Sequence, residues 1–218
     1  MKKNYKKAIL MVSIILIGFG NSMNAQWTMV SSGLVNLLYG SVTTIVSDGT
    51  KMYAGTNVAY GNGGGGVLVS TDNGVNWTQS NTGLTNLNIR AILISGSNIF
   101  AGTYGGGIFL STDNGANWTA MNTGLSNTSS KKIYSLAIIG TTLFAGTDDG
   151  LYVSADNGAT WTITSIANQI YSFLVDGSTI YAAEYLLVHK STDNGATWAQ
   201  SQSFALNSSS TITPFNRW

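Results

Sequence analysis

Short apolar runs, rich in β-branched and aromatic residues, alternate along the chain with turns rich in Gly, Asn and Ser. None of these runs shows the 3.6-residue periodicity of an amphipathic helix. Short runs bounded by glycine turns are typical of strands in an all-β protein. The composition agrees, with 26 Gly, one Pro and only 9% charged residues. The pattern therefore predicts an all-β fold with many turns.

The runs recur in sets of three, and each set is followed by a turn and a tryptophan. The expected first strands are Val42–Ser47, Arg90–Ile94, Tyr134–Ile138 and Tyr171–Val175. The expected second strands are Met52–Thr56, Ile99–Thr103, Leu143–Thr147 and Ile180–Glu184. The expected third strands are Val67–Val69, Ile108–Leu110, Leu151–Val153 and Leu187–His189. We expect a fourth strand to start at each tryptophan.

The spacing between the repeated units indicates the architecture. The turns start at Ser70, Ser111, Ser154 and Ser191, which are 41, 43 and 37 residues apart. Four strands in a repeat of that length are the signature of a β-propeller blade. We therefore predict a β-propeller of about four to five four-stranded antiparallel blades in an incomplete or open ring. The expected blades span about 35–84, 85–125, 126–166 and 167–206.

The repeated turn reads STDNGVNW, STDNGANW, SADNGATW and STDNGATW. Its carboxylate can accept backbone N–H bonds across a tight turn, Asn-Gly tolerates positive φ, and Trp can fill the space between sheets. This motif resembles the Asp-box, or BNR repeat, of sialidase-like propellers, including xyloglucanase-type glycoside hydrolases and a photosystem II assembly factor. The resemblance covers roughly Gln26 to Leu206. It implies a structural role, away from the ligand face, for Asp72, Gly74, Trp77, Asp113, Gly115, Trp118, Asp156, Gly158, Trp161, Asp193, Gly195 and Trp198.

The first 25 residues have the pattern of a signal peptide. Four lysines precede an apolar stretch from Ala8 to Phe19 that is short for a membrane span. We expect cleavage after Ala25 and a secreted protein, and the alternative is an uncleaved membrane anchor. Without this segment six basic residues face nine acidic ones. The resulting net negative charge opposes a nucleic-acid partner, which needs a basic face.

The array of repeats is expected to be incomplete. The stretch from Gln26 to Leu34 resembles the end of a repeat, so it predicts a lone fourth strand. The tail at 207–218 is too short for the three strands that would complete that blade. Either the ring is open, or the N-terminal strand pairs elsewhere, or the chain is part of a longer protein. An open ring leaves unpaired strand edges, which are a route to self-association.

One face of the predicted propeller collects the residues that depart from the repeat. The first strands start there with Thr43, Arg90, Tyr134 and Tyr171, where a plain core would carry Val or Ile. Loops on a rigid scaffold are a common place for function. The alternative is that these side chains plug the channel mouth and that the acids only solubilise. The candidate ligand-binding residues are Arg90, Tyr104, Tyr134, Tyr171, Glu184 and Tyr185.

Catalysis is the less favoured interpretation. The resemblance implies three arginines and a Tyr–Glu pair for a sialidase, but only Arg90 and Arg217 follow the signal peptide. A glycosidase needs two carboxyl groups at a set separation, and the weak candidates are Asp148, Asp149 and Glu184. We favour a secreted, non-catalytic propeller that binds glycan or protein at the cell surface. The runner-up is a glycoside hydrolase-like fragment that lacks the arginine triad.

No metal or cofactor is expected. His189 has no Cys or second His to form a ligand set, and we expect it to lie on a strand surface. The repeated turns lack the Asp ladder of a calcium loop. The chain also has no Cys, so stability must come from packing.

Overall fold

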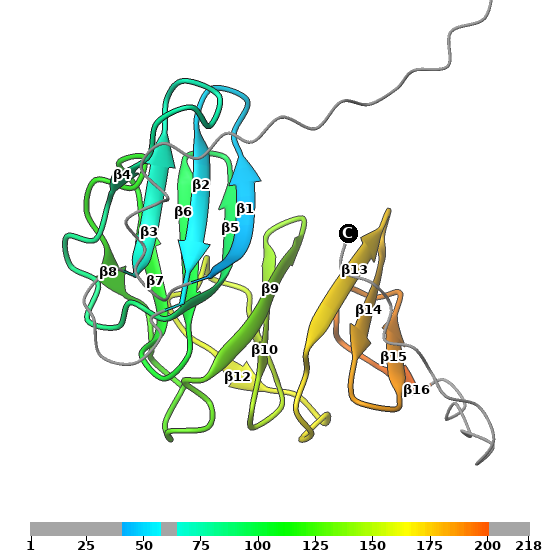
Figure 1. Ribbon diagram of the computed structural model, residues 1–218. Coiled ribbons are helices and arrows are strands. Elements are labelled where there is room, and N and C mark those ends of the chain that lie inside the picture. Colours follow the sequence, from blue (N-terminus) through cyan, green and yellow to red (C-terminus); the bar gives the residue numbers. More distant parts are fainter. Residues whose placement is uncertain (1–40, 58–64, 201–218) are drawn as a thin grey trace, which may run out of the picture.

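The computed structural model describes residues 41–57 and 65–200, in which sixteen strands form four four-stranded sheets (Figure 1). The strands of each sheet follow chain order, and sequential strands pair antiparallel. The expected signal peptide, the strand expected from Gln26 to Leu34, and the tail at 207–218 lie outside the described residues. The strands are β1 (Val42–Ser47), β2 (Met52–Thr56), β3 (Gly66–Ser70), β4 (Thr78–Gln79), β5 (Ile89–Ser95), β6 (Asn98–Thr103), β7 (Gly107–Ser111), β8 (Thr119–Ala120), β9 (Ile133–Ile139), β10 (Thr142–Thr147), β11 (Leu151–Ser154), β12 (Thr162–Ile163), β13 (Ser172–Asp176), β14 (Thr179–Ala183), β15 (Val188–Ser191) and β16 (Ala199–Gln200).

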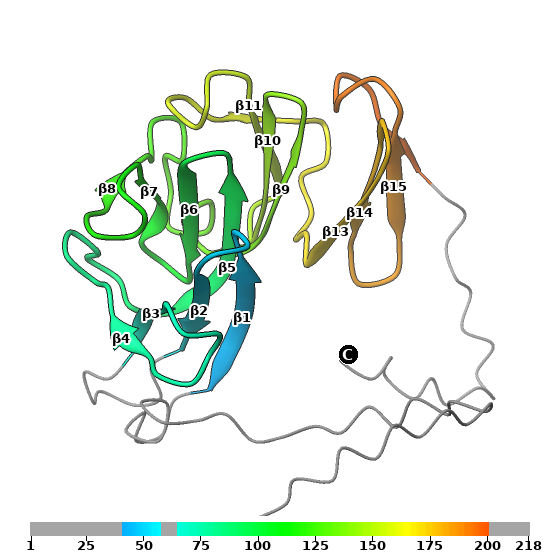
Figure 2. The same ribbon diagram turned by 90° about the horizontal axis from the view of Figure 1, so that it is seen from above.

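The four sheets are arranged as blades along an arc. Seen from above, the first strand of each blade lies on the inner side of the arc, and β1 and β13 stand at its two ends (Figure 2). The chain folds as an open β-propeller. Blades 1 to 4 are the sheets β1–β4, β5–β8, β9–β12 and β13–β16.

The first three strands of each blade lie within two residues of their expected bounds. The expected start of the fourth strand at the tryptophan is wrong by one residue. Each fourth strand begins one residue after the tryptophan and is two residues long. In blades 2 and 3 the tryptophan amide is committed elsewhere, because Trp118 and Trp161 donate their backbone N–H to the preceding blade.

The hydrophobic core lies between blades, because each sheet presents one side-chain face to each neighbour. Between blades 1 and 2, buried Tyr53 and Val67 pack with Ile99, Phe109 and Trp118. The next junction repeats this packing with Phe100, Ile108, Leu143, Tyr152 and Trp161. Aromatic side chains bury the largest apolar area per residue, so they dominate these interfaces. Each blade is therefore stabilised mainly by its neighbours.

A four-residue segment after each of the first two blades fastens it to the next blade. We call Asn81–Leu84 and Asn122–Leu125, both Asn-Thr-Gly-Leu, the clasps. The Thr82 carbonyl accepts the Trp118 backbone N–H (2.8 Å), and the Ser80 carbonyl accepts the Trp118 indole N–H (2.9 Å). Each clasp asparagine also bonds its own blade, as in the bond from the Val67 N–H to Asn81 Oδ1 (2.9 Å).

The second clasp repeats these bonds. The Thr123 carbonyl accepts the Trp161 backbone N–H (2.9 Å), and the Met121 carbonyl accepts the Trp161 indole N–H (3.0 Å). Gly124 has φ +96° and lies against the Trp161 carbonyl, so a side chain there would overlap that oxygen. The clasps therefore depend on glycine both for the backbone conformation and for the close approach.

The outer face of blade 4 is uncovered within the described residues. Leu174 on β13 is 62% exposed, and a hollow of about 270 Å³ is lined by apolar side chains that include Phe173, Tyr181 and Val188. At the other end of the arc Ile45 on β1 is 53% exposed. Self-association through these ends stays a prediction.

Replacing Gly124 by Ala should lower the free energy of unfolding by about 3 kcal/mol or more, because backbone strain adds to overlap with the Trp161 carbonyl. Gly140→Ala is the matched control: Gly140 also has positive φ, but nothing lies within 4 Å of its added Cβ. That control should cost about 1 kcal/mol, from strain alone. Urea unfolding of the two variants measures the difference, and equal losses would contradict the role of the clasp.

Candidate functional site

The repeated D-N-G turns, Ser70–Trp77 and its three counterparts, join the third and fourth strands of each blade. In the first turn Asp72 Oδ1 accepts the Asn76 backbone N–H and the Ser70 hydroxyl, both at 2.8 Å. Ser70 Oγ in turn accepts the Gly74 N–H (2.8 Å). Asn73 and Gly74 both have positive φ, which Asn and Gly tolerate best. The same bonds recur in the other three turns, so the Asp side chain organises the turn itself.

These hydrogen bonds favour the ionised carboxylates. Bonds from the side chain and backbone of the residue four positions later hold the pKa of Asp113, Asp156 and Asp193 at about 2. The Asn76 backbone and side chain likewise lower the pKa of Asp72. The cause is hydrogen bonding to the charged form.

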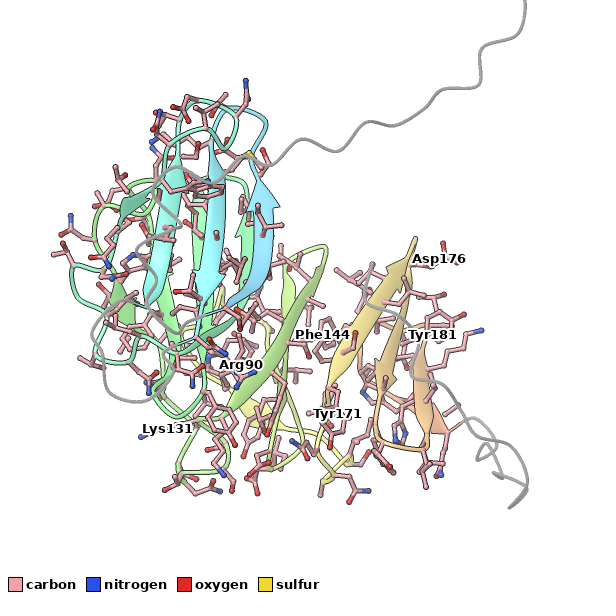
Figure 3. All side chains as sticks on the ribbon, viewed as in Figure 1. Arg90, Lys131, Phe144, Tyr171, Asp176 and Tyr181 are labelled. Carbon is pink, nitrogen blue, oxygen red and sulfur yellow. The ribbon has the colours of Figure 1, made fainter. Side chains whose placement is uncertain are left out.

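The opposite end of the blades carries the side chains that depart from the repeat. Asp176 marks the turn end of β13 in Figure 3, and Tyr171 and Arg90 lie toward the other end. Bulges interrupt the pairing of the first and second strands at Thr43, Arg90 and Tyr134. A bulge re-aims one side chain out of the regular alternation. The side chains of these three residues are therefore not part of the regular alternation that fills the core.

Arg90, Tyr104, Tyr134 and Tyr171 form a continuous line of side chains across blades 2, 3 and 4, which we call the tyrosine row. The rings of Tyr104 and Tyr134 meet edge-to-face with centroids 5.7 Å apart, and those of Tyr134 and Tyr171 do so at 5.6 Å. The guanidinium carbon of Arg90 lies 5.2 Å from the Tyr104 centroid. Arg90 Nε is buried with no hydrogen-bond partner among the described residues.

Thr43, the fourth member of the sequence column, does not extend the row. Its hydroxyl donates to the carbonyls of Ile89 (2.7 Å) and Gly55 (3.0 Å), so it ties blade 1 to blade 2. Tyr185 also stands apart. It is 82% exposed, and in the described part of the chain its ring makes none of the ring contacts that join the row.

Lys132 lies beside the tyrosine row and is not among the candidate residues chosen from the sequence. Its ammonium lies 2.9 Å from Asp148 Oδ2 and 5.7 Å from the Tyr104 centroid. Asp148 also accepts the hydroxyls of Tyr134 and Ser129, each at 3.3 Å. The bond from Lys132 lowers the pKa of the Asp148 carboxyl, and the same pair raises the pKa of Lys132. Asp148 thus holds Lys132 and Tyr134 in place.

Asp149 is equally engaged. Its Oδ2 accepts the Tyr152 hydroxyl (2.9 Å) and the Asn127 amide (2.8 Å), which fixes the loop before blade 3. Glu184 lies with its Oε1 2.6 Å from His189 Nε2. All three carboxylates that the sequence offered for catalysis therefore have partners within the protein.

His189 corrects one expectation. It is buried, at 9% exposure, and faces blade 3 rather than lying on a strand surface. The register explains this, because His189 pairs with Ala182 just as Phe109 pairs with Ala101, and Phe109 lies in the core between blades. The bond to Glu184 compensates for the hydrogen bonds to water that the imidazole loses on burial. No group of three or more His, Cys, Asp or Glu able to hold a metal occurs within 41–57 and 65–200.

Residues 108–214 match a family described as the DUF6242 beta propeller domain. A search of curated proteins finds no match. Among solved structures, the chain is similar to an ancestral GH74 enzyme, with 23% identity and a TM-score of 0.60 over 78% of this chain and 24% of that one. It is also similar to YCF48 bound to D1 peptide, with 14% identity and a TM-score of 0.53 over 73% of this chain and 55% of that one.

A third similar structure is the extracellular domain of a B. thetaiotaomicron protein described as a hybrid two component system. Identity is 17% and the TM-score 0.57, over 78% of this chain and 24% of that one. The chain thus spans about a quarter of the GH74 enzyme and just over half of YCF48. At these identities the similarity establishes the β-propeller fold. Within the described residues no helix is long and apolar enough to cross a membrane.

The D-N-G turns predict a specific acid response. The pKa of Asp113 is about 2 in the folded chain, below its ordinary value of 3.8, so ionisation of Asp113 stabilises the fold above about pH 4. That stabilisation is lost as the pH falls toward 2. The variant Asp113→Asn should melt several degrees below the wild type at pH 6, and this gap should shrink between pH 4 and pH 2. A gap that is constant over this range would contradict the role of the carboxylate. High salt should change the gap little, because the partners are neutral hydrogen-bond donors.

Proposed function

We propose that the protein is a secreted, non-catalytic β-propeller of the Asp-box (BNR) type that binds a glycan or a protein segment on the tyrosine row. The observation that carries this proposal is the row itself, in which side chains from three blades touch in sequence. Two of its four members stand at bulges. The core residues repeat from blade to blade, whereas the residues at this face differ, so this face can serve in binding without loss of the core packing.

The chemistry of the row suits a ligand with both apolar and polar groups. Tyrosine offers a rigid apolar ring with a hydroxyl at its edge, and such rings are enriched in binding sites. Tyr171 is 43% exposed at the end of the row, so part of its ring is open to solvent. Arg90 adds a fixed cationic group, and its buried Nε has no hydrogen-bond partner within the described part of the chain. A sugar chain or an extended peptide matches this combination.

Secretion is part of the proposal. It rests on the lysine-rich and apolar pattern of residues 1–25. Two similar structures support the proposal: one is the extracellular domain of the B. thetaiotaomicron protein, and the other is YCF48 bound to D1 peptide.

The hydrolase alternative has weaker support. Hydrolysis of a glycosidic bond requires a proton-donating carboxyl and a second carboxylate flanking the substrate. Asp148 is paired with Lys132, which favours its ionised form. Asp149 and Glu184 are each bonded to side chains of the protein. Release of reducing sugar by the wild type, lost in Glu184→Gln and Asp149→Asn, would reverse this preference.

The double variant Tyr134→Ala/Tyr171→Ala should weaken ligand binding at least about thirtyfold, because truncation of an aromatic anchor typically costs about 2 kcal/mol or more. A glycan array and a peptide array on residues 26–218 identify the ligand, and titration calorimetry gives the Kd. Asp113→Ala is the control. Asp113 lies in a D-N-G turn at the end of the blades opposite the tyrosine row, so this variant should lower the melting temperature and leave the Kd unchanged. Equal loss in both variants, or unchanged binding in the double variant, would contradict the proposal.

A further inference from the structure

The junction between blades 3 and 4 differs from the two junctions before it. At three matching positions the earlier junctions carry an apolar side chain, an aromatic ring and a small hydroxyl, whereas the last junction carries an amide, an imidazole and a carboxylate. The matching residues are Leu84, Leu125 and Asn168; Phe109, Tyr152 and His189; and Thr103, Thr147 and Glu184. Three departures from one repeat thus meet at one place in the fold.

The three polar side chains bond to one another. His189 Nε2 lies 2.6 Å from Glu184 Oε1, and Asn168 Nδ2 donates to Glu184 Oε2 (3.3 Å). The side chains of Glu184 and His189 are only 8% and 11% exposed. The threonines at the position of Glu184 instead donate to the start of the next strand of their own blade, as Thr103 Oγ1 does to the Gly107 carbonyl (2.8 Å). Burying a carboxylate and an imidazole here costs stability compared with the less polar residues at the matching positions of the earlier junctions.

The clasp is missing from this junction. The segment in its place is Ser165-Ile166-Ala167-Asn168, and no backbone bond from it to Trp198 occurs among the described residues. The Trp198 indole N–H donates instead to Gly195 of its own turn (3.1 Å). Trp198 is half-buried, whereas Trp118 and Trp161 are buried.

A cavity of about 280 Å³ opens where the clasp is absent. It is lined by Trp198, Glu184 and His189 together with Asn168, Gln200 and Ser165 of the surrounding segments. At about 280 Å³ the cavity lies at the lower end of small-molecule sites, which start at about 300 Å³, so its size limits it to a ligand of about one sugar ring. Its lining combines part of an indole and two aliphatic residues with a carboxylate, an imidazole, two amides and a hydroxyl.

The charges of the lining select the class of ligand. An anion would meet the Glu184 carboxylate, and no Lys or Arg of the described residues lines the cavity. A cation would find its one charged acceptor in Glu184, whose oxygens already contact His189 and Asn168, and it could not use the amide N–H donors of Asn168 and Gln200. Neutral hydroxyl groups can both donate to Glu184 and exchange bonds with the amides, and an aromatic side chain packs against the C–H face of a sugar ring. We propose that the cavity between blades 3 and 4 is a binding site for one neutral pyranose unit.

This site adjoins the tyrosine row but does not rest on it. The Tyr171 N–H donates to the Ala183 carbonyl (2.9 Å), one residue before Glu184. A glycan held on the row could therefore place one unit in the cavity. A monosaccharide tests the cavity alone, because it is too short to span both.

The test is titration of residues 26–218 with neutral monosaccharides (glucose, galactose, mannose, xylose and N-acetylglucosamine), followed by saturation-transfer NMR and calorimetry. Acetate and ethylamine serve as charged probes. We expect at least one pyranose to bind saturably and neither charged probe to bind at this site. Failure of every pyranose, or binding of ethylamine in its place, would overturn the proposal.

Two variants locate the binding. Asn168→Leu/Glu184→Thr/His189→Tyr restores the residues of the earlier junctions and should abolish binding while it keeps or raises the melting temperature. Glu184→Gln keeps the shape and should raise the Kd at least about tenfold, because bonds to a charged acceptor are the stronger ones. Tyr134→Ala/Tyr171→Ala should keep monosaccharide binding even if it loses the ligand of the row. Binding that survives in both cavity variants would overturn the proposal.

Discussion

The fold depends on the tryptophans that blades 2 and 3 pack against the blade before each of them. Trp118 and Trp161 each donate two hydrogen bonds across a junction, one from the backbone and one from the indole. The D-N-G turn brings the ring into position, and the clasp glycine lets the preceding chain approach the tryptophan carbonyl. A blade alone buries little, because its core residues face its neighbours. The tryptophan and the clasp therefore set the distance and the angle at which blades stack.

That stacking positions the ligand face. With the blades held at the D-N-G end, the starts of the first strands converge at the opposite end, where bulges turn Arg90 and Tyr134 out of the core pattern. The rings of Tyr104, Tyr134 and Tyr171 then meet although they come from different blades and loops. The last junction differs because it lacks the clasp sequence. There the Trp198 indole donates to Gly195 in its own D-N-G turn, and a polar cavity remains between blades 3 and 4.

Much of this architecture could be predicted from the repeat. Gapless alignment of segments such as Ile99–Thr103 and Leu143–Thr147 fixes strand order and the faces of the sheet, because side chains alternate with period two. The members of the tyrosine row share a column or a loop, so their common face was predictable. Their contacts were not, because the bulges that bring them together have no sequence signal of their own.

His189 taken by itself, a single polar residue in a short strand, suggests a surface position. Its alignment with Phe109 and Tyr152 carried the signal of burial, and Glu184 beside it carried the signal of a partner. Lys132 and Asp148 meet through loop conformation, which spacing does not encode.

Amide hydrogen exchange at Trp118, Trp161 and Trp198 measures how firmly each blade is joined to the one before it. We expect the backbone amides of Trp118 and Trp161 to exchange at least about a hundredfold more slowly than that of Trp198, because only the first two donate across a junction to a clasp. The measurement needs only the ¹⁵N-labelled wild-type protein and its assigned tryptophan amides. Equal protection at all three would mean that blades 3 and 4 are joined as tightly as the others, and would contradict both the role of the clasp and the open junction.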